Sequence, residues 1–525
     1  MTVTVANLPY SFCPNSSSQS NTGFMFKNAY DAWYYANSTA TATQITDIDY
    51  PGYHTYSATL TSSGTTATAT VAAGHGLSVG DSVTIAGATQ TEYNGTYTVV
   101  TVADSTHFTY TFAGSATTPA TGTITATGGA VTVPGIVFID GYFVVMDTNA
   151  ILYTSGLNDA TAWNALDFAA AQEEPGAGKA LGKTPGYVVA FKEWDIEPYY
   201  DAANATGLPL SPVQNGMMPI GCASGDSLAS MDGDLFWVSQ TRQKGRAVHF
   251  MRGLQAGQVS TPDVERILNL STLATVRAFG LKIAGHAFYV LTLVDQDITL
   301  VFDAVTKTWA EWSSLTLGTP VSVTSITLSG TTATVTATAH GITDGDPALI
   351  AGANQAAYNG IKVAKYIDAN TFSFETTAGT TTPATGTITS TPYTETYFKY
   401  TKYIHALGKD LVQHESDGTL CELTETAYQD VGKPVNVVMR TGKVGDGNKL
   451  LRYGSLAVIG NKVDGTAYVR YSGDDYVTNS AYRAVDLNAE RSKINRLGAD
   501  YRRSFELRYL ENTSLQIGAL DIDVV

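Results

Sequence analysis

The sequence predicts an all-β protein with a β-propeller-like body, two inserted small β-sandwich or barrel modules, and a C-terminal β-sandwich. Three observations predict this architecture. A block of about 70 residues occurs twice. Strand–turn–strand units opened by glycine recur about every 40 to 50 residues outside the block. After about Pro434 the chain consists of alternating strands rich in arginine.

The duplicated block begins "HGLSVGDSVTIAGATQTEYNGTYTV" at His75 and "HGITDGDPALIAGANQAAYNGIKV" at His340. The offset is 265 positions at the start and 264 at Pro383, which matches Pro119, so one residue has slipped. Small β-branched residues alternate with alanine, and Asn-Gly precedes a Val/Tyr run, which is a strong hairpin signal. Each copy is therefore predicted to form five or six short strands, at residues 58–128 and 321–392.

The body is predicted over residues 1–57, 129–320 and 393–430, with six or seven blades. Units open near Gly141, Gly186 and Gly285, and another lies near Leu407. Such antiparallel units with apolar strands are typical of propeller blades, which bury both faces against their neighbours. Long insertions between strands cost little closure entropy, so a propeller can accept the same module at two places.

Two further segments complete the prediction. "STPDVERILN" from Ser260 carries a capping residue, an early proline and acidic residues near its start, and it predicts one short helix with Ile267 and Leu268 on its buried side. Residues 431–525 predict the C-terminal β-sandwich, with one charged face, because arginine alternates with apolar residues.

Charge is distributed unevenly along the chain. The net charge is −16, but residues 1–178 hold a single basic residue, Lys27, against twelve acidic ones, whereas residues 399–525 hold seventeen of each. A protein that grips nucleic acid needs lysine and arginine to neutralise phosphates. The first third of the chain is therefore expected to repel DNA.

The sequence predicts no catalytic, cofactor-binding or metal-binding residues, and no cofactor. "EEPGAGKA" lacks the first glycine of a phosphate loop, at Glu173, and its hydroxyl residue, at Ala180. Acidic turns near Asp232 and Gly445 lack the remaining ligands of a calcium loop.

The histidines and the remaining carboxylates give the same result. His75 and His340 precede glycines at turns, which favours a structural role. His405 and His414, near Asp410 and Asp417, have no usual zinc spacing. The adjacent Glu173 and Glu174 are expected to be solvated.

Three further features of the sequence concern its aromatic residues, its cysteines and its apolar runs. "NAYDAWYYAN" from Asn28 is interpreted as a strand or interface patch, with a sugar platform as the alternative. Cys13, Cys222 and Cys421 are far apart and are expected to be reduced, buried thiols. No apolar run is long enough to span a bilayer, and the N-terminus has no signal-peptide pattern.

Several segments resemble a known family, the tail-hub or nozzle proteins of short-tailed bacteriophages, also called packaged-DNA stabilisation or head-completion proteins. The most specific is "RLGADYRRSFELRYLENTSLQIGALDIDV" at the C-terminus, followed by "VSTPDVERIL" from Val259 and "DAVTKTWAEWSS". The resemblance runs from about Gly141 to the C-terminus apart from the second block. The block itself resembles small β-modules of phage tail and adhesion proteins. Both modules and the base-poor N-terminal stretch depart from the family pattern.

The resemblance implies a structural virion protein without enzymatic activity. It implies a homohexameric ring below portal and adaptor, which extends and closes the DNA exit channel and carries tail fibres or spikes. Packaged DNA would pass the lumen without specific binding, no membrane insertion is expected, and the location would be the virion tail after assembly in the host cytoplasm. The alternatives are a receptor- or glycan-binding adhesin that uses the repeated modules, and a carbohydrate-active propeller enzyme.

Overall fold

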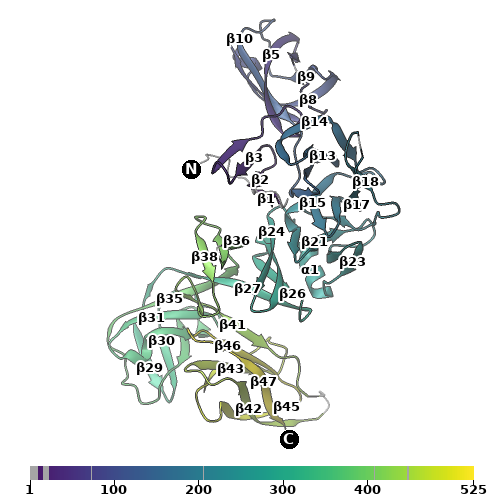
Figure 1. Cartoon of the computed structure of the whole chain (residues 1–525). Helices are drawn as coiled ribbons and strands as arrows, with labels where there is room; N and C mark the ends of the chain where they lie inside the picture. The colour runs from purple at the N-terminus through teal and green to yellow at the C-terminus, as the bar shows by residue number, and fades with distance from the viewer. Residues whose placement is uncertain are drawn as a thin grey trace. The chain divides into compact units, whose positions relative to one another are not determined.

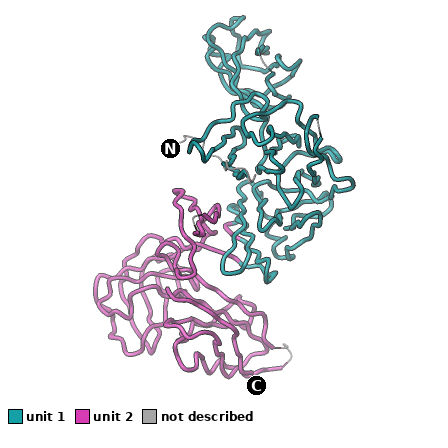
Figure 2. Tube along the Cα trace, viewed as in Figure 1, with its two compact units in different colours: residues 1–296, 300–310 teal, residues 297–299, 311–525 magenta. Residues whose placement is uncertain are grey.

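The computed structural model describes residues 10–15, 23–72, 74–204, 206–406, 408–445 and 449–524. The described chain is almost entirely β, with one α-helix, α1 (Pro262–Leu270), which confirms the predicted fold class at this level. It forms two compact units, residues 1–296 with 300–310 and residues 297–299 with 311–525 (Figures 1 and 2). No helix of the described part is long and apolar enough to cross a membrane.

Outside the first module, the first unit is built from successive antiparallel sheets of four or five strands. The first holds β1 (Ser11–Pro14), β2 (Gly23–Lys27), β3 (Ala32–Ala36) and β4 (Thr41–Gln44). The second holds β11 (Val137–Ile139), β12 (Tyr142–Met146), β13 (Ile151–Gly156) and β14 (Asp159–Ala170). The third holds β15 (Gly178–Thr184), β16 (Tyr187–Lys192), β17 (Ile196–Asp201) and β18 (Leu210–Pro212).

Two more sheets follow along the chain. The fourth has the order β19 (Gly221–Cys222), β21 (Asp234–Gln240), β22 (Ala247–Arg252) and β23 (Gln255–Gln258), with β20 (Ala229–Met231) paired to β21. The fifth group has the order β24 (Val276–Ile283), β25 (His286–Leu293), β26 (Ile298–Asp303) and β27 (Thr308–Leu317), and it is part of an eight-stranded sheet that continues from the end of β27 into the second module. The helix α1 connects the fourth and fifth sheets, and its buried residues are Val264 and Leu268, whereas the predicted Ile267 is only half-buried.

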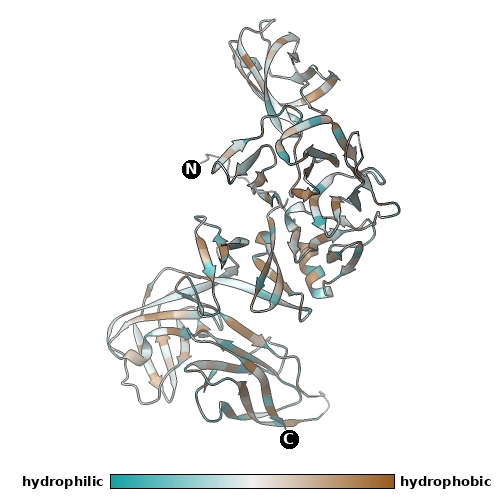
Figure 3. Ribbon diagram, viewed as in Figure 1, coloured by the Kyte–Doolittle hydropathy of each residue, from teal (hydrophilic) through white to brown (hydrophobic). Residues whose placement is uncertain are grey.

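Consecutive sheets pack face to face through shared cores. One cluster joins the first and second sheets, a second joins the second and third, and a third joins the third and fourth. Phe236 of the fourth sheet stacks on Tyr289 of the fifth at 5.5 Å between ring centroids. Strands such as β12 and β16 are buried on both faces, which explains their unbroken apolar runs. Figure 3 shows hydrophobic stretches on strands throughout this unit. This is the packing expected of propeller blades.

The turns inside these sheets follow the predicted chemistry. Gly141 opens its unit with φ +98°, a value that favours glycine. At the next turn the buried Asp147 carboxylate accepts the backbone N–H groups of Asn149 and Ile151, each at 2.9 Å. The Asp147 side chain therefore provides hydrogen-bond partners for backbone N–H groups that, at this turn, have no partner on a neighbouring strand.

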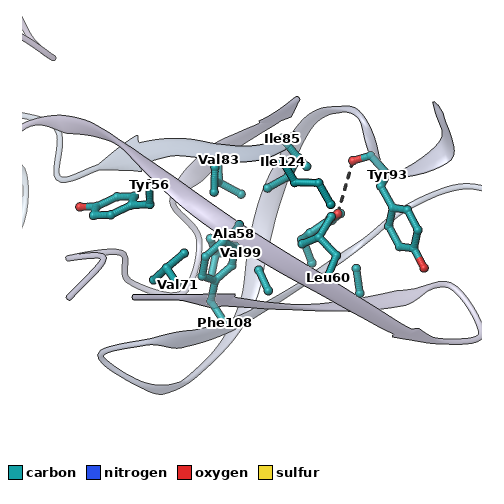
Figure 4. Close-up of a cluster of buried hydrophobic side chains, with 14 of the residues drawn as sticks. Tyr56, Ala58, Leu60, Val71, Val83, Ile85, Tyr93, Val99, Phe108 and Ile124 are labelled. Atoms are coloured by element: carbon teal, nitrogen blue, oxygen red, sulfur yellow. Dashed lines mark hydrogen bonds between the residues drawn. The ribbon is translucent and has the colours of Figure 1, made fainter. Parts of the chain in front are cut away.

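The first module is a closed barrel inserted between the first and second sheets. Its strands, in barrel order, are β10 (Gly122–Gly129), β5 (Tyr53–Ser63), β6 (Thr66–Val71), β9 (His107–Thr111), β8 (Gly95–Asp104) and β7 (Ser82–Ala88). Alternate residues point inward and fill the interior, as Figure 4 shows for ten labelled side chains. The prediction of five or six short strands is confirmed for this copy.

The second module, which precedes β36 (Tyr400–Ala406) in the chain, does not close into one barrel: its strands form two sheets, and its last strand also pairs with Ser313–Leu317 of β27. Its strands are β28 (Val321–Ser322), β29 (Ser325–Ser329), β30 (Thr332–Thr336), β31 (Pro347–Ala353), β32 (Gly360–Val363), β33 (Lys365–Asp368), β34 (Thr371–Glu375) and β35 (Gly386–Tyr397). Strand β8 of the first copy bulges between Val99 and Thr101, whose counterparts in the second copy are the consecutive Ala364 and Lys365. Val100 is therefore the extra residue that produces the slip.

The rest of the second unit contains a small sheet, a short ladder and a sandwich. The small sheet holds β36, β37 (Lys409–His414) and β38 (Leu420–Leu423), and the ladder β39 (Gln429–Asp430) and β40 (Lys433–Pro434). One sandwich sheet has the order β41 (Val437–Arg440), β46 (Ser504–Tyr509), β43 (Thr466–Ser472) and β44 (Arg483–Asp486). The other has the order β45 (Lys493–Asp500), β42 (Leu451–Gly460) and β47 (Ile517–Val524). Both sheets contribute to one apolar core.

Candidate functional site

The two module histidines make matching internal contacts. His75 is 1% exposed, accepts the backbone N–H of Leu77 at Nδ1 (3.0 Å), and places Nε2 3.0 Å from the carbonyl oxygen of Asp104. His340 repeats this geometry with Ile342 (3.0 Å) and the carbonyl oxygen of Asp368 (2.9 Å). Both ring nitrogens are thus engaged by the backbone, as in a structural turn.

The other histidine and carboxylate candidates do not converge on one place. His405 pairs with Asp410 at 2.7 Å, whereas His414 lies 3.7 Å from Asp417, so the two histidines have separate partners. No group of three or more His, Cys, Asp or Glu residues in the described chain is arranged to hold a metal ion.

The remaining sequence candidates lie on ordinary elements. Asp232 forms an exposed pair with Lys282 at 2.7 Å. Gly178 and Ala180 belong to strand β15, not to a phosphate loop. The turn that follows Gly445 includes residues outside the described part of the chain. Cys13 and Cys222 are buried free thiols, whereas Cys421 is only half-buried.

The adjacent glutamates cover a buried charge cluster that the sequence did not reveal. Lys192 is fully buried, and its Nζ lies 2.5 Å from Glu197 Oε1 and 3.0 Å from Asp195 Oδ2. The same Nζ donates to the carbonyl oxygen of Glu174, and the backbone N–H of Glu173 donates to Glu197 at 3.0 Å. The loop of Glu173 and Glu174 is therefore tied to the cluster by its backbone. Burial raises the pKa of Asp195 to about 6, although Lys192 lowers it.

Lys27, the single basic residue of the first 178, does not reach solvent. It is 1% exposed, and its Nζ donates to Thr132 Oγ1 at 3.0 Å and to the Val133 carbonyl oxygen at 2.5 Å. Burial lowers the pKa of Lys27 to about 7. Residues 1–178 therefore expose no lysine or arginine of their own, and outside this stretch Arg242 lies 3.7 Å from Glu174.

The aromatic residues near Asn28 belong to a larger row on the first sheet. Phe12, Phe26 and Trp33 are direct cross-strand partners, and their rings stack at 5.9 and 5.5 Å. Phe24 stacks on Tyr35 at 5.1 Å. Phe12 is 64% exposed, so one face of this sheet presents apolar rings. The rings stack mainly on each other, as in an interface patch.

The largest charged cluster lies on the C-terminal sandwich and was also missed. Arg440, Glu506 and Arg470 are direct partners across β41, β46 and β43. Glu506 is fully buried, and it receives Arg440 Nε at 2.8 Å, Arg470 Nη2 at 3.2 Å and the Tyr482 hydroxyl at 2.5 Å. Burial alone would raise the pKa of Glu506, but these hydrogen bonds outweigh it and lower the pKa to about 2.

Strand β46 explains why the cluster is buried. All six of its residues are buried, which requires cover on both faces. Phe505, Leu507 and Tyr509 face the sandwich core. Glu506 and Arg508 face the other way, toward the second module. The sequence SFELRY alternates charged and apolar residues, which is also the pattern of a strand with one solvated face, so the sequence alone did not indicate this interface.

A comparison with known families supports a phage setting. The model of the family described as bacteriophage P22 Gp10, beta-propeller, matches residues 62–322. The match begins within β5 of the first module and ends at β28 of the second, so it includes the second to fifth sheets. It confirms the propeller-like all-β fold, and it supports a structural tail or stabilisation protein of a bacteriophage virion. No curated protein matches the chain.

Several solved structures share broad features with the chain. They include the computationally designed Ika8 protein (9% identity, TM-score 0.26, 77% of this chain and 93% of that chain) and BamB from Moraxella catarrhalis (11%, 0.26, 78% and 95%). The phage phi92 endosialidase is another (11%, 0.17, 77% and 60%). These TM-scores are too low to carry an argument about fold or function.

Proposed function

We propose that the chain is a tail hub or nozzle protein of a short-tailed phage. In this proposal it forms a ring, a homohexamer, below portal and adaptor, extends and closes the DNA exit channel, and carries tail fibres or spikes. It has no enzymatic activity, and it assembles in the host cytoplasm. The observation that carries the proposal is the family match over residues 62–322.

The charge distribution supports a channel role. A surface without exposed cations cannot release counterions from DNA, so it gains no phosphate-binding free energy. The first 178 residues meet this condition, because Lys27 is buried and the stretch holds no other lysine or arginine. DNA that passes such a surface is repelled and slides without being held.

Electron microscopy of the purified full-length chain tests the ring. We expect closed particles with a central hole, and in virions we expect antibody label at the junction of head and tail. Particles that stay monomeric at high concentration and in the virion would contradict the proposal. Label at the distal fibre tips would contradict it as well.

A receptor- or glycan-binding adhesin is the second candidate. The aromatic row that includes the 64% exposed Phe12 favours it, because rings can pack on sugar faces. A glycan array probed with the full-length chain separates the two. Binding that is lost in Phe12→Ala and Phe24→Ala would favour the adhesin, and absence of binding together with a ring would favour the hub.

A further inference from the structure

The two modules present different chemistry at the same positions of the same sheet. In the first module the outward cross-strand pairs on β7 and β8 are Thr84–Thr96 and Ser82–Thr98. In the second module the matching pairs on β31 and β32 are Leu349–Ile361 and Pro347–Val363. Each of the four hydroxyl residues in these pairs is thus replaced by an apolar residue in the second copy.

The hydroxyl residues of the first module face solvent. Thr84, Thr96 and Thr98 are exposed, and Thr84 Oγ1 lies 3.0 Å from Thr96 Oγ1. The row continues to Thr127 on β10 and Thr55 on β5, whose hydroxyls are 2.9 Å apart. A polar, hydrated face of this kind gains nothing from burial against another protein surface.

The apolar residues of the second module face the C-terminal sandwich. Val363 is 2% exposed and shares a buried cluster with Tyr482 and Leu510 of the sandwich. Leu349 and Ile361 pack against the same cluster. The module therefore covers the outer face of the sheet that carries Glu506 and Arg508.

A charged contact adds specificity at the rim of this interface. Asp344 Oδ2 lies 2.7 Å from Arg470 Nη1, and Asp344 Oδ1 lies 3.2 Å from Lys365 Nζ, which donates to the Asn479 carbonyl oxygen at 3.2 Å. The next residue, Gly345, has φ +94°, and a Cβ there would lie 2.9 Å from the Tyr482 hydroxyl. The residue of the first module that matches Asp344 is Val79, which is 66% exposed.

We propose that the second module is a docking module whose outer sheet face binds the C-terminal sandwich and fixes it to β31 and β32. The binding specificity resides in Asp344, Leu349, Ile361 and Val363. The first module, with Val79 and three threonines at these positions, has lost or never had this activity. The duplicated block thus supplies one internal connector and one module whose matching face carries hydroxyl groups instead, whatever the whole protein does.

The test exchanges the four residues between copies in the full-length chain. The variant Asp344→Val, Leu349→Thr, Ile361→Thr, Val363→Thr gives the second module the surface of the first. We expect backbone hydrogen exchange in β43 and β46 to become faster by roughly tenfold or more, because their cover opens locally. Exchange in β30 and β34, inside the module, should stay unchanged. Unaltered exchange in β43 and β46 would overturn the proposal.

The matched control is Val79→Asp, Thr84→Leu, Thr96→Ile, Thr98→Val in the first module. It makes the same four exchanges in reverse, and we expect exchange in the sandwich to stay at the wild-type rate. Faster exchange there would contradict the assignment of the effect to the second module. The four-residue variant of the second module could unfold that module itself, which would appear as fast exchange in β30. In that case the single change Asp344→Val tests the docking proposal. Faster exchange confined to β43 and β46 then supports docking, and no change overturns it.

Discussion

Arg470 Nε lies 2.9 Å from Glu506 Oε1, and both side chains are at most 5% exposed. A second arginine, Arg440, and the Tyr482 hydroxyl contact the same carboxylate. Glu506 therefore neutralises guanidinium charge that the docked module has removed from water. Removing one partner of a buried ion pair lowers the free energy of unfolding strongly, because the remaining charge stays buried without an opposite charge.

Replacement of Glu506 by glutamine keeps the shape and removes the charge. We expect Glu506→Gln to lower the free energy of unfolding by about 3–5 kcal/mol, measured by urea titration with tryptophan fluorescence. The matched control is Glu422→Gln, which breaks a half-exposed pair with Lys409 (2.5 Å) and should cost less than about 1 kcal/mol. Equal losses of unfolding free energy in the two variants would show that the buried cluster contributes no more to stability than an exposed ion pair.

The same residue predicts acid sensitivity. Hydrogen bonds from Tyr482, Arg440 and Arg470 overcome burial and lower the pKa of Glu506 from 4.5 to about 2. Because the folded chain releases this proton more readily than the unfolded chain, the stabilisation is complete above about pH 4.5 and is lost as the pH falls toward 2. Unfolding titrations from pH 6 to 2 should show a steeper loss of stability for the wild type than for Glu506→Gln.

Local patterns predicted much of the fold, and contacts between distant segments account for what they missed. The turn at Asp147, the strands beside it and the helix from Pro262 follow from residues within a few positions. The role of Asp344 depends on Arg470, 126 positions later, and no local pattern encodes that pair. Lys27 lies two positions after Met25 and shares the buried face of β2 with it. The sequence did not predict this burial, because a lone lysine at a strand end is usually solvated.

Asp195 predicts the opposite pH dependence in the first unit. Burial raises its pKa to about 6, so the folded chain holds this proton between about pH 4 and 6 while the unfolded chain has lost it. Its contribution to stability is therefore largest at low pH and falls as the pH rises through 6.

Asparagine imitates the protonated form of Asp195. We expect Asp195→Asn to be more stable than the wild type at pH 7, by about 1–3 kcal/mol, and to equal it below about pH 4. The measurement is urea unfolding at pH 4, 5.5 and 7. A loss of stability at pH 7 would show that the ion pair with Lys192 (3.0 Å) outweighs the burial of the carboxylate.

Lys27 predicts a third pH dependence, at alkaline pH. Burial lowers its pKa from 10.5 to about 7, so between these values the unfolded chain binds a proton that the folded chain does not. The free-energy cost of burying the charged Lys27 ammonium is therefore complete below about pH 7 and declines as the pH rises. We expect the stability difference between Lys27→Met and the wild type to shrink from pH 7 to 9.5. A difference that stays constant across this range would show that Lys27 keeps its proton in the folded chain throughout, as it does in the unfolded chain.

The matching histidines allow one experiment to be done twice in the same chain. In each module the buried imidazole accepts one backbone N–H and contacts one backbone carbonyl. Loss of these contacts and of the ring volume should cost about 2–4 kcal/mol in each copy. Hydrogen exchange on His75→Ala should therefore accelerate within β5 to β10, and on His340→Ala within β28 to β35. If the second module is docked on the sandwich, His340→Ala should also accelerate exchange in β43 and β46, whereas His75→Ala should leave every other sheet unchanged. The histidine contacts are the same in both copies, so such a difference would come from the docking of the second module.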